Sequence, residues 1–189
     1  MNLGCVLLGA GNSVRFGENK LLYELDGKPM AFYALELHGA AQYAARVLVT
    51  QPSFAALWEK AEQCGFLVAV NRDPSRGIGS SVRIGLRVLL LSGARTDGVL
   101  FGVCDQPYVA PATLEKLIQT FTQNPDRIVA LSFGGRRGNP VIFPAAYYAE
   151  LLSVSGDTGG GQVIAKHPEA LLLVEAASGN ELADIDTKR

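Results

Sequence analysis

Residues Leu8 to Lys20 read LGAGNSVRFGENK, directly after an apolar run that starts at Leu3. The stretch contains three glycines and two cations: Gly9, Gly11, Gly17, Arg15 and Lys20. Glycines after a strand let backbone N–H groups approach phosphate oxygens and form an anion-binding nest. Cations spaced along such a loop can neutralise a polyphosphate. A tight turn with a solvated arginine and lysine fits the same spacing, which does not decide between the two interpretations.

The rest of the chain alternates short apolar runs with helical patterns, which predicts βαβ units and a mainly parallel sheet. The expected strands are Leu3–Leu8, Arg46–Thr50, Phe66–Val70, Gly98–Val103, Ile128–Ser132, Val141–Phe143, Leu171–Val174 and Leu182–Ile185. The expected helices are Met30–Gln42, Ser53–Cys64, Ser80–Leu91, Pro111–Thr122, Ala145–Leu152 and Gln162–Lys166. We therefore expect an α/β fold, a single Rossmann-like three-layer domain over residues 1–189 with a mainly parallel mixed sheet.

Ligands of such sheets bind beyond the carboxyl ends of the strands. This rule selects Gly9–Lys20, Asn71–Ser81 and Asp105–Tyr108. The first segment is not a dinucleotide loop, because it lacks the third glycine of GxGxxG and because Gln51, not an acid, follows the second strand. It is not a P-loop either, since Gly17 is followed by Glu18 instead of a lysine.

The composition is that of an ordinary globular protein, with 48% hydrophobic and 19% charged residues and a formal net charge of -1. No global field attracts it to nucleic acid or to a membrane surface, so an anion must be bound by local groups. The cysteines Cys5, Cys64 and Cys104 form no CxxC pair, which favours buried thiols in a reducing compartment. The N-terminus has no signal-peptide pattern, and we expect a cytoplasmic protein.

The first loop resembles the signature of nucleotidyltransferases, typically LxAGxSxRxGxxK, and the chain is most similar to the molybdopterin cytidylyltransferase group of that superfamily. Further segments resemble that group in order: GIGSSVRIGL (Gly77–Leu86), CDQPYVAPATLEKLI (Cys104–Ile118), GRRGNPVIF (Gly135–Phe143), SGDTGGGQVI (Ser155–Ile164) and DIDT (Asp184–Thr187). Gly9 stands where alanine is usual, Cys104 where glycine often precedes the aspartate, and Asn139 where histidine is common.

This resemblance implies a role for particular residues. It implies that the nucleotide is bound by Leu8, Gly9, Ala10, Gly11, Arg15, Lys20, Ser80, Ser81 and Asp105. It implies catalytic roles for Arg15, Lys20 and Asp105. It implies that Asn139 and Asp157 bind the acceptor, and that Mg²⁺ is held by Asp105, Asp184 and Asp186.

The residues themselves leave alternatives open. Asp105 follows a strand, where a carboxylate can hold Mg²⁺, but it could also cap a turn before Pro107. Asp184 and Asp186 stand two apart on an expected strand, so they would point to opposite faces and only one would reach the metal directly. One of the serines at the start of the third helix is expected to cap it. The Asp157 loop could simply be flexible.

The segment around Arg136 and Arg137 can be a hairpin tip or can meet the phosphate of a pterin. Neither His38 nor His167 stands at a sequence spacing from another residue that would indicate a catalytic or metal-binding partner, and we assign them no role.

The function that the resemblance implies is transfer of CMP from CTP to the terminal phosphate of molybdopterin cofactor, with Mg²⁺ and release of pyrophosphate. The resemblance also implies that Ala10 favours CTP over GTP, since members of the group that use cytidine have alanine at this position and those that use guanosine generally have glycine; a methyl group there would shorten the base pocket. The alternatives are GTP or a sugar-phosphate acceptor on the same fold, or a pterin carrier that serves a molybdoenzyme client without turnover. No nucleic acid or membrane is expected as a partner.

Overall fold

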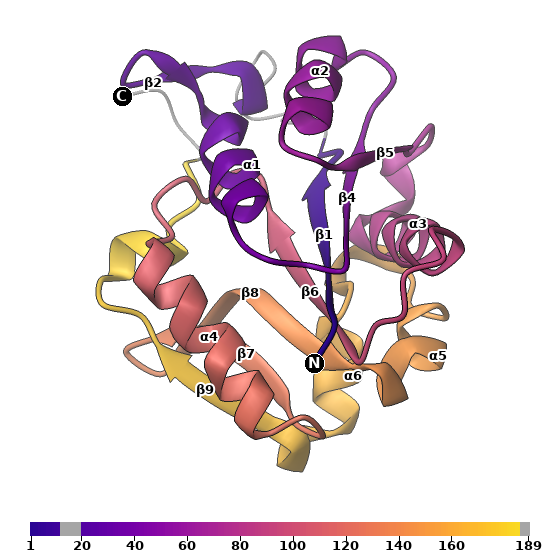
Figure 1. Ribbon diagram of the computed structural model, residues 1–189, viewed down its shortest axis with the longest axis vertical. Coiled ribbons are helices and arrows are strands. Elements are labelled where there is room, and N and C mark those ends of the chain that lie inside the picture. Colours follow the sequence, from indigo (N-terminus) through magenta and orange to yellow (C-terminus); the bar gives the residue numbers. More distant parts are fainter. Residues whose placement is uncertain (12–19, 186–189) are drawn as a thin grey trace.

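A computed structural model describes residues 1–11 and 20–185, and in these ranges it has the α/β fold that the sequence predicts. A seven-stranded sheet runs in the order β5-β4-β1-β6-β8-β7-β9 (Figure 1). Its strands are β1 (Leu3–Gly9), β4 (Ala45–Thr50), β5 (Leu67–Val70), β6 (Gly98–Val103), β7 (Ile128–Phe133), β8 (Arg136–Pro144) and β9 (Leu171–Glu175). Only β8 runs antiparallel to its neighbours in this sheet, which confirms a mainly parallel mixed sheet.

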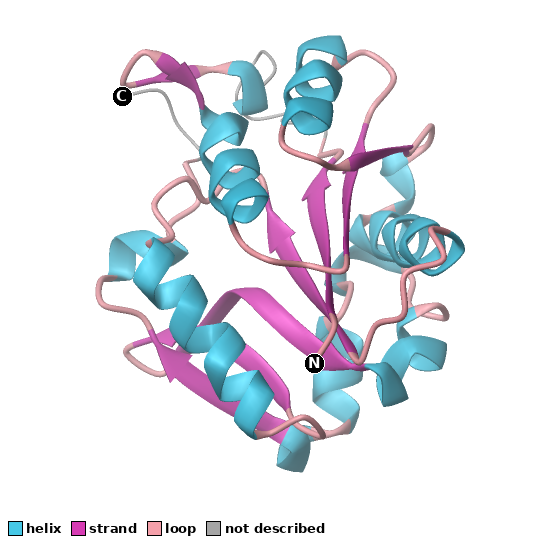
Figure 2. Ribbon diagram, in the orientation of Figure 1, coloured by secondary structure: helices cyan, strands magenta, loops and turns pink. Residues whose placement is uncertain are grey.

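Helices cover both faces of the sheet (Figure 2), as expected for three layers. They are α1 (Met30–Ala40), α2 (Ala55–Gln63), α3 (Ile78–Leu91), α4 (Pro111–Gln123), α5 (Tyr148–Leu151) and α6 (Gly161–Lys166). Each face of the sheet has its own hydrophobic core cluster. Helices α1, α2 and α4 contribute to the cluster on one face, and α3, α5 and α6 contribute to the cluster on the other.

The central strand β1 shows why its sequence reads as one apolar run. Successive side chains of a strand point to opposite faces, so a strand covered on both faces needs apolar residues throughout. Cys5 and Leu7 belong to the cluster under α1, α2 and α4. Val6 belongs to the other cluster, together with Val82 and Leu86 of α3.

The sequence prediction is wrong at the C-terminal end, where no strand covers Leu182–Ile185. Instead a 3₁₀ helix spans Gly179–Leu182 and is started by a capping box between Ser178 and Glu181. The capping box closes this turn, and Glu181 also accepts the Ala110 N–H at 3.0 Å, so the chain is held here as a capped turn instead of a strand.

A small hairpin was not predicted from the sequence. Strands β2 (Glu24–Leu25) and β3 (Lys28–Pro29) pair antiparallel around Asp26 and Gly27, which have φ angles of 50° and 80°. An Asp-Gly pair with two positive φ angles is typical of a tight hairpin turn. The strands are too short to show an alternating pattern.

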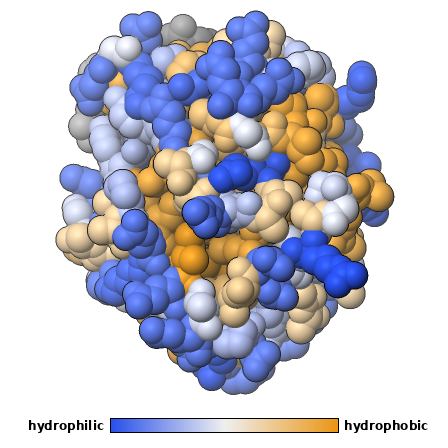
Figure 3. Space-filling model, viewed as in Figure 1, coloured by the Kyte–Doolittle hydropathy of each residue, from blue (hydrophilic) through white to orange (hydrophobic). Residues whose placement is uncertain are grey.

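The surface is of mixed polarity. In Figure 3, hydrophilic side chains occupy much of the outline, and hydrophobic ones show mainly toward the middle and the upper right of this face. Within residues 1–11 and 20–185, none of the helices combines the length and the apolar character that a bilayer crossing requires.

Candidate functional site

The carboxyl ends of β1 and β6 border a cavity of about 420 Å³, which is called the larger cavity below. The N-terminal end of α3 and the loop before it complete its wall. Most of the residues expected to bind the nucleotide line it: Leu8, Gly9, Ala10, Gly11, Lys20, Ser81 and Asp105. Arg15 lies outside the described residues. The fold thus gathers three segments that the strand-end rule selected separately.

A second, smaller cavity of about 220 Å³ adjoins the first. The two share Leu8, Ile78, Val103 and Asp157 as lining residues. Asn139 and Asp157, the residues expected at the acceptor, both line the smaller cavity. Its wall also includes the aromatic rings of Phe101 and Phe143, the Arg137 side chain and the Gly159–Gly161 loop. The two expected binding regions are therefore neighbours with a common boundary.

An ion pair joins two of the expected catalytic residues inside the larger cavity. Lys20 Nζ lies 3.0 Å from Asp105 Oδ2, although the two residues are 85 positions apart. Lys20 begins a 3₁₀ helix (Lys20–Leu22) and is only 7% exposed, while Asp105 follows β6. A buried lysine needs a negative partner, because burial of an unpaired charge is costly. Asp105 is such a partner, and an anionic ligand in the cavity can be another.

Gln51 holds the backbone of the first loop, a role that the sequence analysis missed. Its Nε2 donates to the carbonyl oxygens of Ala10 at 2.8 Å and of Gly11 at 3.3 Å. Gln51 follows β4, and the last residue of β4, Thr50, lies opposite Gly9 in the sheet. The indole N–H of Trp58 donates to the Gln51 carbonyl at 3.2 Å. Only the position of Gln51 in the sequence could have indicated this role, because it is a polar residue directly after a strand that pairs with β1.

Asn71 plays the corresponding part for the second loop. It follows β5, and its backbone N–H donates to the Thr50 carbonyl at 2.8 Å. Its Nδ2 donates to Ser80 Oγ and to Ser81 Oγ, each at 2.9 Å. Two amide side chains after adjacent parallel strands, Gln51 and Asn71, thus support the two loops that border the larger cavity.

The expectation that a serine caps α3 is wrong. The helix begins at Ile78, its N-cap residue is Gly77, and no side chain caps it. Glycine stands there because the chain has a φ of 82°, which other residues rarely adopt. Ser80 donates to the Gly77 carbonyl at 2.8 Å and, unlike Ser81, is not among the residues that line the larger cavity.

The expected metal ligands are placed only in part. Gln106, next to Asp105 in the chain, donates through Nε2 to Asp184 Oδ1 at 2.9 Å, which brings Asp184 to the Asp105 segment. Asp186 lies outside the described residues. Because no strand covers 182–185, strand alternation no longer assigns Asp184 and Asp186 to opposite faces.

The donors that the structure does bring to this segment are carboxylate oxygens, which is the chemistry that Mg²⁺ prefers. Within the described ranges, no three His, Cys, Asp or Glu side chains gather into a metal site. The magnesium site stays a prediction.

Two departures from the family pattern lie against each other. A Cβ atom on Gly9 would stand 3.1 Å from the Cys104 sulfur, so the larger side chain at 104 occupies the space that an alanine at 9 would need. Burial, and secondarily the Asp105 charge, raises the pKa of the Cys104 thiol well above its usual range. Cys104 therefore stays protonated and acts in packing.

His38 is a packed core histidine. Its Nδ1 lies 2.9 Å from the Tyr43 hydroxyl, and burial, helped by the Arg46 charge, lowers the pKa of His38 to about 4.

The glycine turn before β8 is tighter than the sequence suggested. Only Gly134 and Gly135 form the tip, with φ angles of 56° and 78°, and the strand already begins at Arg136. The expected hairpin is therefore present, with Arg136 and Arg137 flanking its tip as the first residues of β8, where they lie opposite Phe133 and Ser132. Arg137 belongs to the wall of the smaller cavity, while Arg136 is not among its lining residues.

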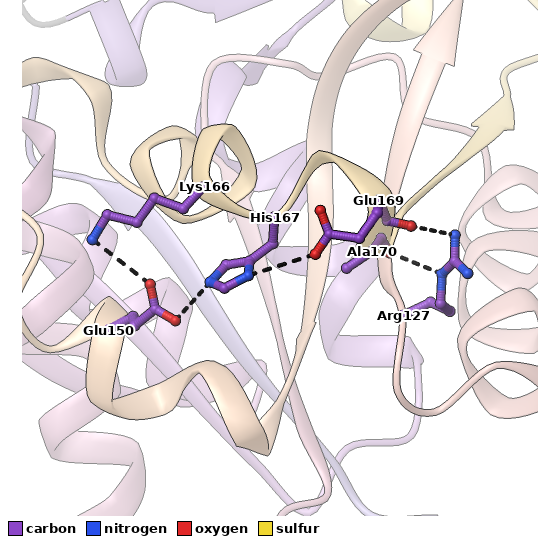
Figure 4. A network of polar contacts seen from close by, with 6 residues as sticks. All are labelled: Arg127, Glu150, Lys166, His167, Glu169 and Ala170. Atoms are coloured by element: carbon purple, nitrogen blue, oxygen red, sulfur yellow. Dashed lines mark hydrogen bonds and ion pairs between the residues drawn. The ribbon is translucent and has the colours of Figure 1, made fainter.

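A polar network supports the elements behind the smaller cavity (Figure 4). His167 Nε2 lies 2.8 Å from Glu150 Oε1, and the other oxygen of Glu150 lies 3.7 Å from Lys166 Nζ. Arg127 donates to the backbone carbonyls of Glu169 and Ala170. These contacts join α5 to the C-terminal end of α6 and to the turn that follows it. His167, which received no role from the sequence, thus supports the helix whose first residue, Gly161, lines the smaller cavity.

Replacement of Gly77 by alanine is expected to cost more stability than the same replacement of Gly93. Both glycines have a φ near 80°, and Gly77 combines it with a ψ of 170°, a conformation that costs a residue other than glycine about 1–3 kcal/mol. At Gly77 the new Cβ would also meet the Gly156 backbone and lie 2.5 Å from Asp157 Oδ1, whereas at Gly93 nothing lies within 4 Å. Thermal unfolding of the two variants measures the difference. Equal losses would mean that the Gly77 and Gly156 loops do not pack as described.

Comparison with known proteins supplies the last observation on this site. Residues 5–171 match the family model described as a MobA-like NTP transferase domain. The purine catabolism protein PucB of Bacillus subtilis is 28% identical over 190 residues, which cover 96% of this chain and 90% of that protein.

A probable molybdenum cofactor guanylyltransferase of Pyrococcus furiosus is 30% identical over 65% of this chain and 57% of its own length. The solved structure of Rv0371c from Mycobacterium tuberculosis has a TM-score of 0.79 at 26% identity, covering 99% of this chain and 94% of that one.

Proposed function

The chain belongs to the family of MobA-like NTP transferase domains, and we propose that it transfers CMP from CTP to the terminal phosphate of molybdopterin cofactor. The observation that carries the proposal is the pair of adjoining cavities with Asp157 at their common boundary. A nucleotidyl transfer needs two substrates whose reacting atoms meet, and two neighbouring sites allow this.

The larger cavity suits a nucleoside triphosphate. Its volume of about 420 Å³ lies in the range of small-molecule sites. The Gly9–Gly11 loop brings backbone to its wall, and Lys20 supplies a positive charge for phosphate oxygens. Leu8 and Ile78 add an apolar surface for a base or ribose.

The smaller cavity suits an acceptor that is flat and partly apolar but carries an anionic end. Phe101 and Phe143 offer ring surfaces, and their centroids are 6.1 Å apart in an edge-to-face arrangement. Asn139 can hydrogen-bond to a heterocycle, and the Arg137 guanidinium can pair with a phosphate. A pterin that bears a phosphate combines these features.

The chemistry asks the protein mainly to position the reactants and to stabilise charge. The acceptor phosphate is already anionic at neutral pH, so no strong general base is needed. One of its oxygens attacks the α-phosphorus of the nucleotide in line, and pyrophosphate leaves. Lys20, nearly buried, stabilises the negative charge that develops on the departing phosphates.

Asp105 and Asp184 would hold a magnesium ion, with Asp186 as a further candidate, and the ion would neutralise additional phosphate charge when bound. Oxygen ligands of this kind suit Mg²⁺. A divalent metal is supported by one of the similar solved structures, described as Rv0371c in complex with manganese, at 25% identity and a TM-score of 0.73.

A second candidate keeps the reaction and uses GTP. It is favoured by the relatives from Pyrococcus furiosus and Pyrococcus horikoshii, which are named probable molybdenum cofactor guanylyltransferases. PucB, which aligns with more of this chain, carries a name that specifies no nucleotide.

Pyrophosphate release tests both candidates. The purified protein is supplied with Mg²⁺ and with CTP or GTP, each with and without molybdopterin cofactor. We expect release with CTP only when the cofactor is present. Faster release with GTP would support the second candidate, while tight binding of the cofactor without release from any nucleotide would identify a carrier and refute the transferase proposal.

Ala10→Gly is expected to narrow the preference for CTP over GTP without reversing it. Ala10 lines the larger cavity and its carbonyl is held by Gln51, so removal of the methyl group enlarges the pocket while its backbone anchor remains. One methyl group is worth about 10- to 200-fold in discrimination at most. Steady-state rates with both nucleotides measure the ratio, and a wild-type protein that favours GTP would overturn the assignment.

A further inference from the structure

The orientation of the Asn71 side chain is fixed by the backbone beside it. Asn71 is 2% exposed, and its Oδ1 accepts a hydrogen bond from the Asp73 N–H at 3.0 Å. A backbone N–H can pair only with the oxygen of an amide, which excludes the flipped arrangement. The Nδ2 group must therefore face α3, where it donates to Ser80 Oγ and Ser81 Oγ.

The two serine hydroxyls then differ in where their protons go. Ser80 donates to the Gly77 carbonyl at 2.8 Å, and the same oxygen accepts the Ser80 backbone N–H at 3.1 Å. Both lone pairs of that carbonyl are occupied, so it cannot serve Ser81 as well. Among the described residues, none accepts the Ser81 hydroxyl proton, and Ser81 lines the larger cavity.

We propose that Asn71 is a positioning residue that makes Ser81 a hydrogen-bond donor toward the bound nucleotide. The Ser81 oxygen is occupied on its Asn71 side, which leaves its proton to point toward the cavity. Its partner must be an acceptor atom of the nucleoside: a base carbonyl, a ring nitrogen or a ribose oxygen. This inference rests on the proposed function of the larger cavity as a nucleotide site.

Asn71→Asp tests the donor assignment with little change in shape. The new carboxylate accepts hydrogen bonds only, so both serine hydroxyls must turn their protons toward it. Ser81 then presents lone pairs to an acceptor atom of the ligand. We expect the affinity for CTP, measured by calorimetry with Mg²⁺ and without acceptor, to fall by about tenfold or more.

Ser80 provides a matched control, because it receives the same hydrogen bond from the same nitrogen but does not line the cavity. Asn71→Asp should cause a much smaller loss in a Ser81→Ala background, where the proton to be turned is absent and only repulsion between the new carboxylate and the nucleotide phosphates remains. In a Ser80→Ala background the loss should persist. Such a double-mutant cycle isolates the coupling between Asn71 and Ser81 from any general effect on the helix.

Equal losses in the wild-type and Ser81→Ala backgrounds would show that Asn71 acts through the loop as a whole, and would overturn the inference alone. A wild-type protein that binds neither CTP nor GTP would overturn the proposed function with it. If Asn71→Asp does not fold, Asn71→Ala is used in the same cycle, with a smaller expected loss because the freed hydroxyl can still donate. Repeating the cycle with 2′-deoxy-CTP tests one acceptor: coupling that disappears indicates the ribose 2′-oxygen, and coupling that remains indicates the base or another ribose oxygen.

Discussion

Lys20→Ala is expected to lower kcat by about 10²–10³-fold while nucleotide affinity changes much less. Negative charge grows on the leaving pyrophosphate, so a cation that meets it stabilises the transition state more than the bound substrate. Lys20 is 7% exposed, and charge interactions are stronger in such a weakly solvated place than in water. Steady-state kinetics, together with direct measurement of nucleotide binding, separate the two effects.

Lys28→Ala is the matched control for this experiment. Lys28 is also paired with a carboxylate, Glu36, at 2.5 Å, but it lies on the small hairpin and is not among the residues that line either cavity. Its loss should leave kcat close to that of the wild type, because Lys28 lines neither cavity. A Lys20→Ala variant that changed only KM would show that Lys20 binds substrate and transition state equally, which contradicts the role proposed for it.

Asp105→Asn should remove Mg²⁺-dependent activity, with a loss of about 10²–10³-fold or more, because an amide replaces the carboxylate proposed to hold the ion. The substitution also takes the ion-pair partner from Lys20. Removal of one partner from a fully buried ion pair costs about 3–5 kcal/mol of stability. The Asp105 side chain is 31% exposed, so the loss of stability here should be smaller. Activity is measured across a Mg²⁺ titration, at a temperature where thermal unfolding shows the variant folded.

Asp97→Asn controls for the loss of a carboxylate near the same strand. Asp97 precedes β6 at its amino end and accepts a hydrogen bond from the Asn2 N–H at 2.7 Å, whereas Asp105 follows the carboxyl end. Asp97→Asn should leave the Mg²⁺ dependence unchanged. If Asp105→Asn instead titrated with Mg²⁺ as the wild type does, Asp105 would not belong to the metal site.

Local pattern in the sequence was enough to predict the fold class and most of the elements. The continuous apolar run of β1 indicates that both faces of the strand are buried, because the side chains of adjacent residues point to opposite faces. The strand-end rule then selected three loops, and the structure brings all three to the larger cavity. Arg15 and Asp186 lie outside the described residues, and their roles stay predictions.

The tertiary structure alone decided which residues meet. Lys20 and Asp105 are 85 positions apart, and no local pattern records their ion pair. Gln51 and Asn71 are ordinary polar residues in the sequence; they support the site because β4 lies between β1 and β5.

The same reason explains the wrong strand at Leu182–Ile185. Glu181, in the capping box before it, also accepts the Ala110 N–H at 3.0 Å, a contact between segments 71 positions apart. Hydrophobic periodicity reports burial, whereas the partner of a buried polar group depends on which segments the fold brings together.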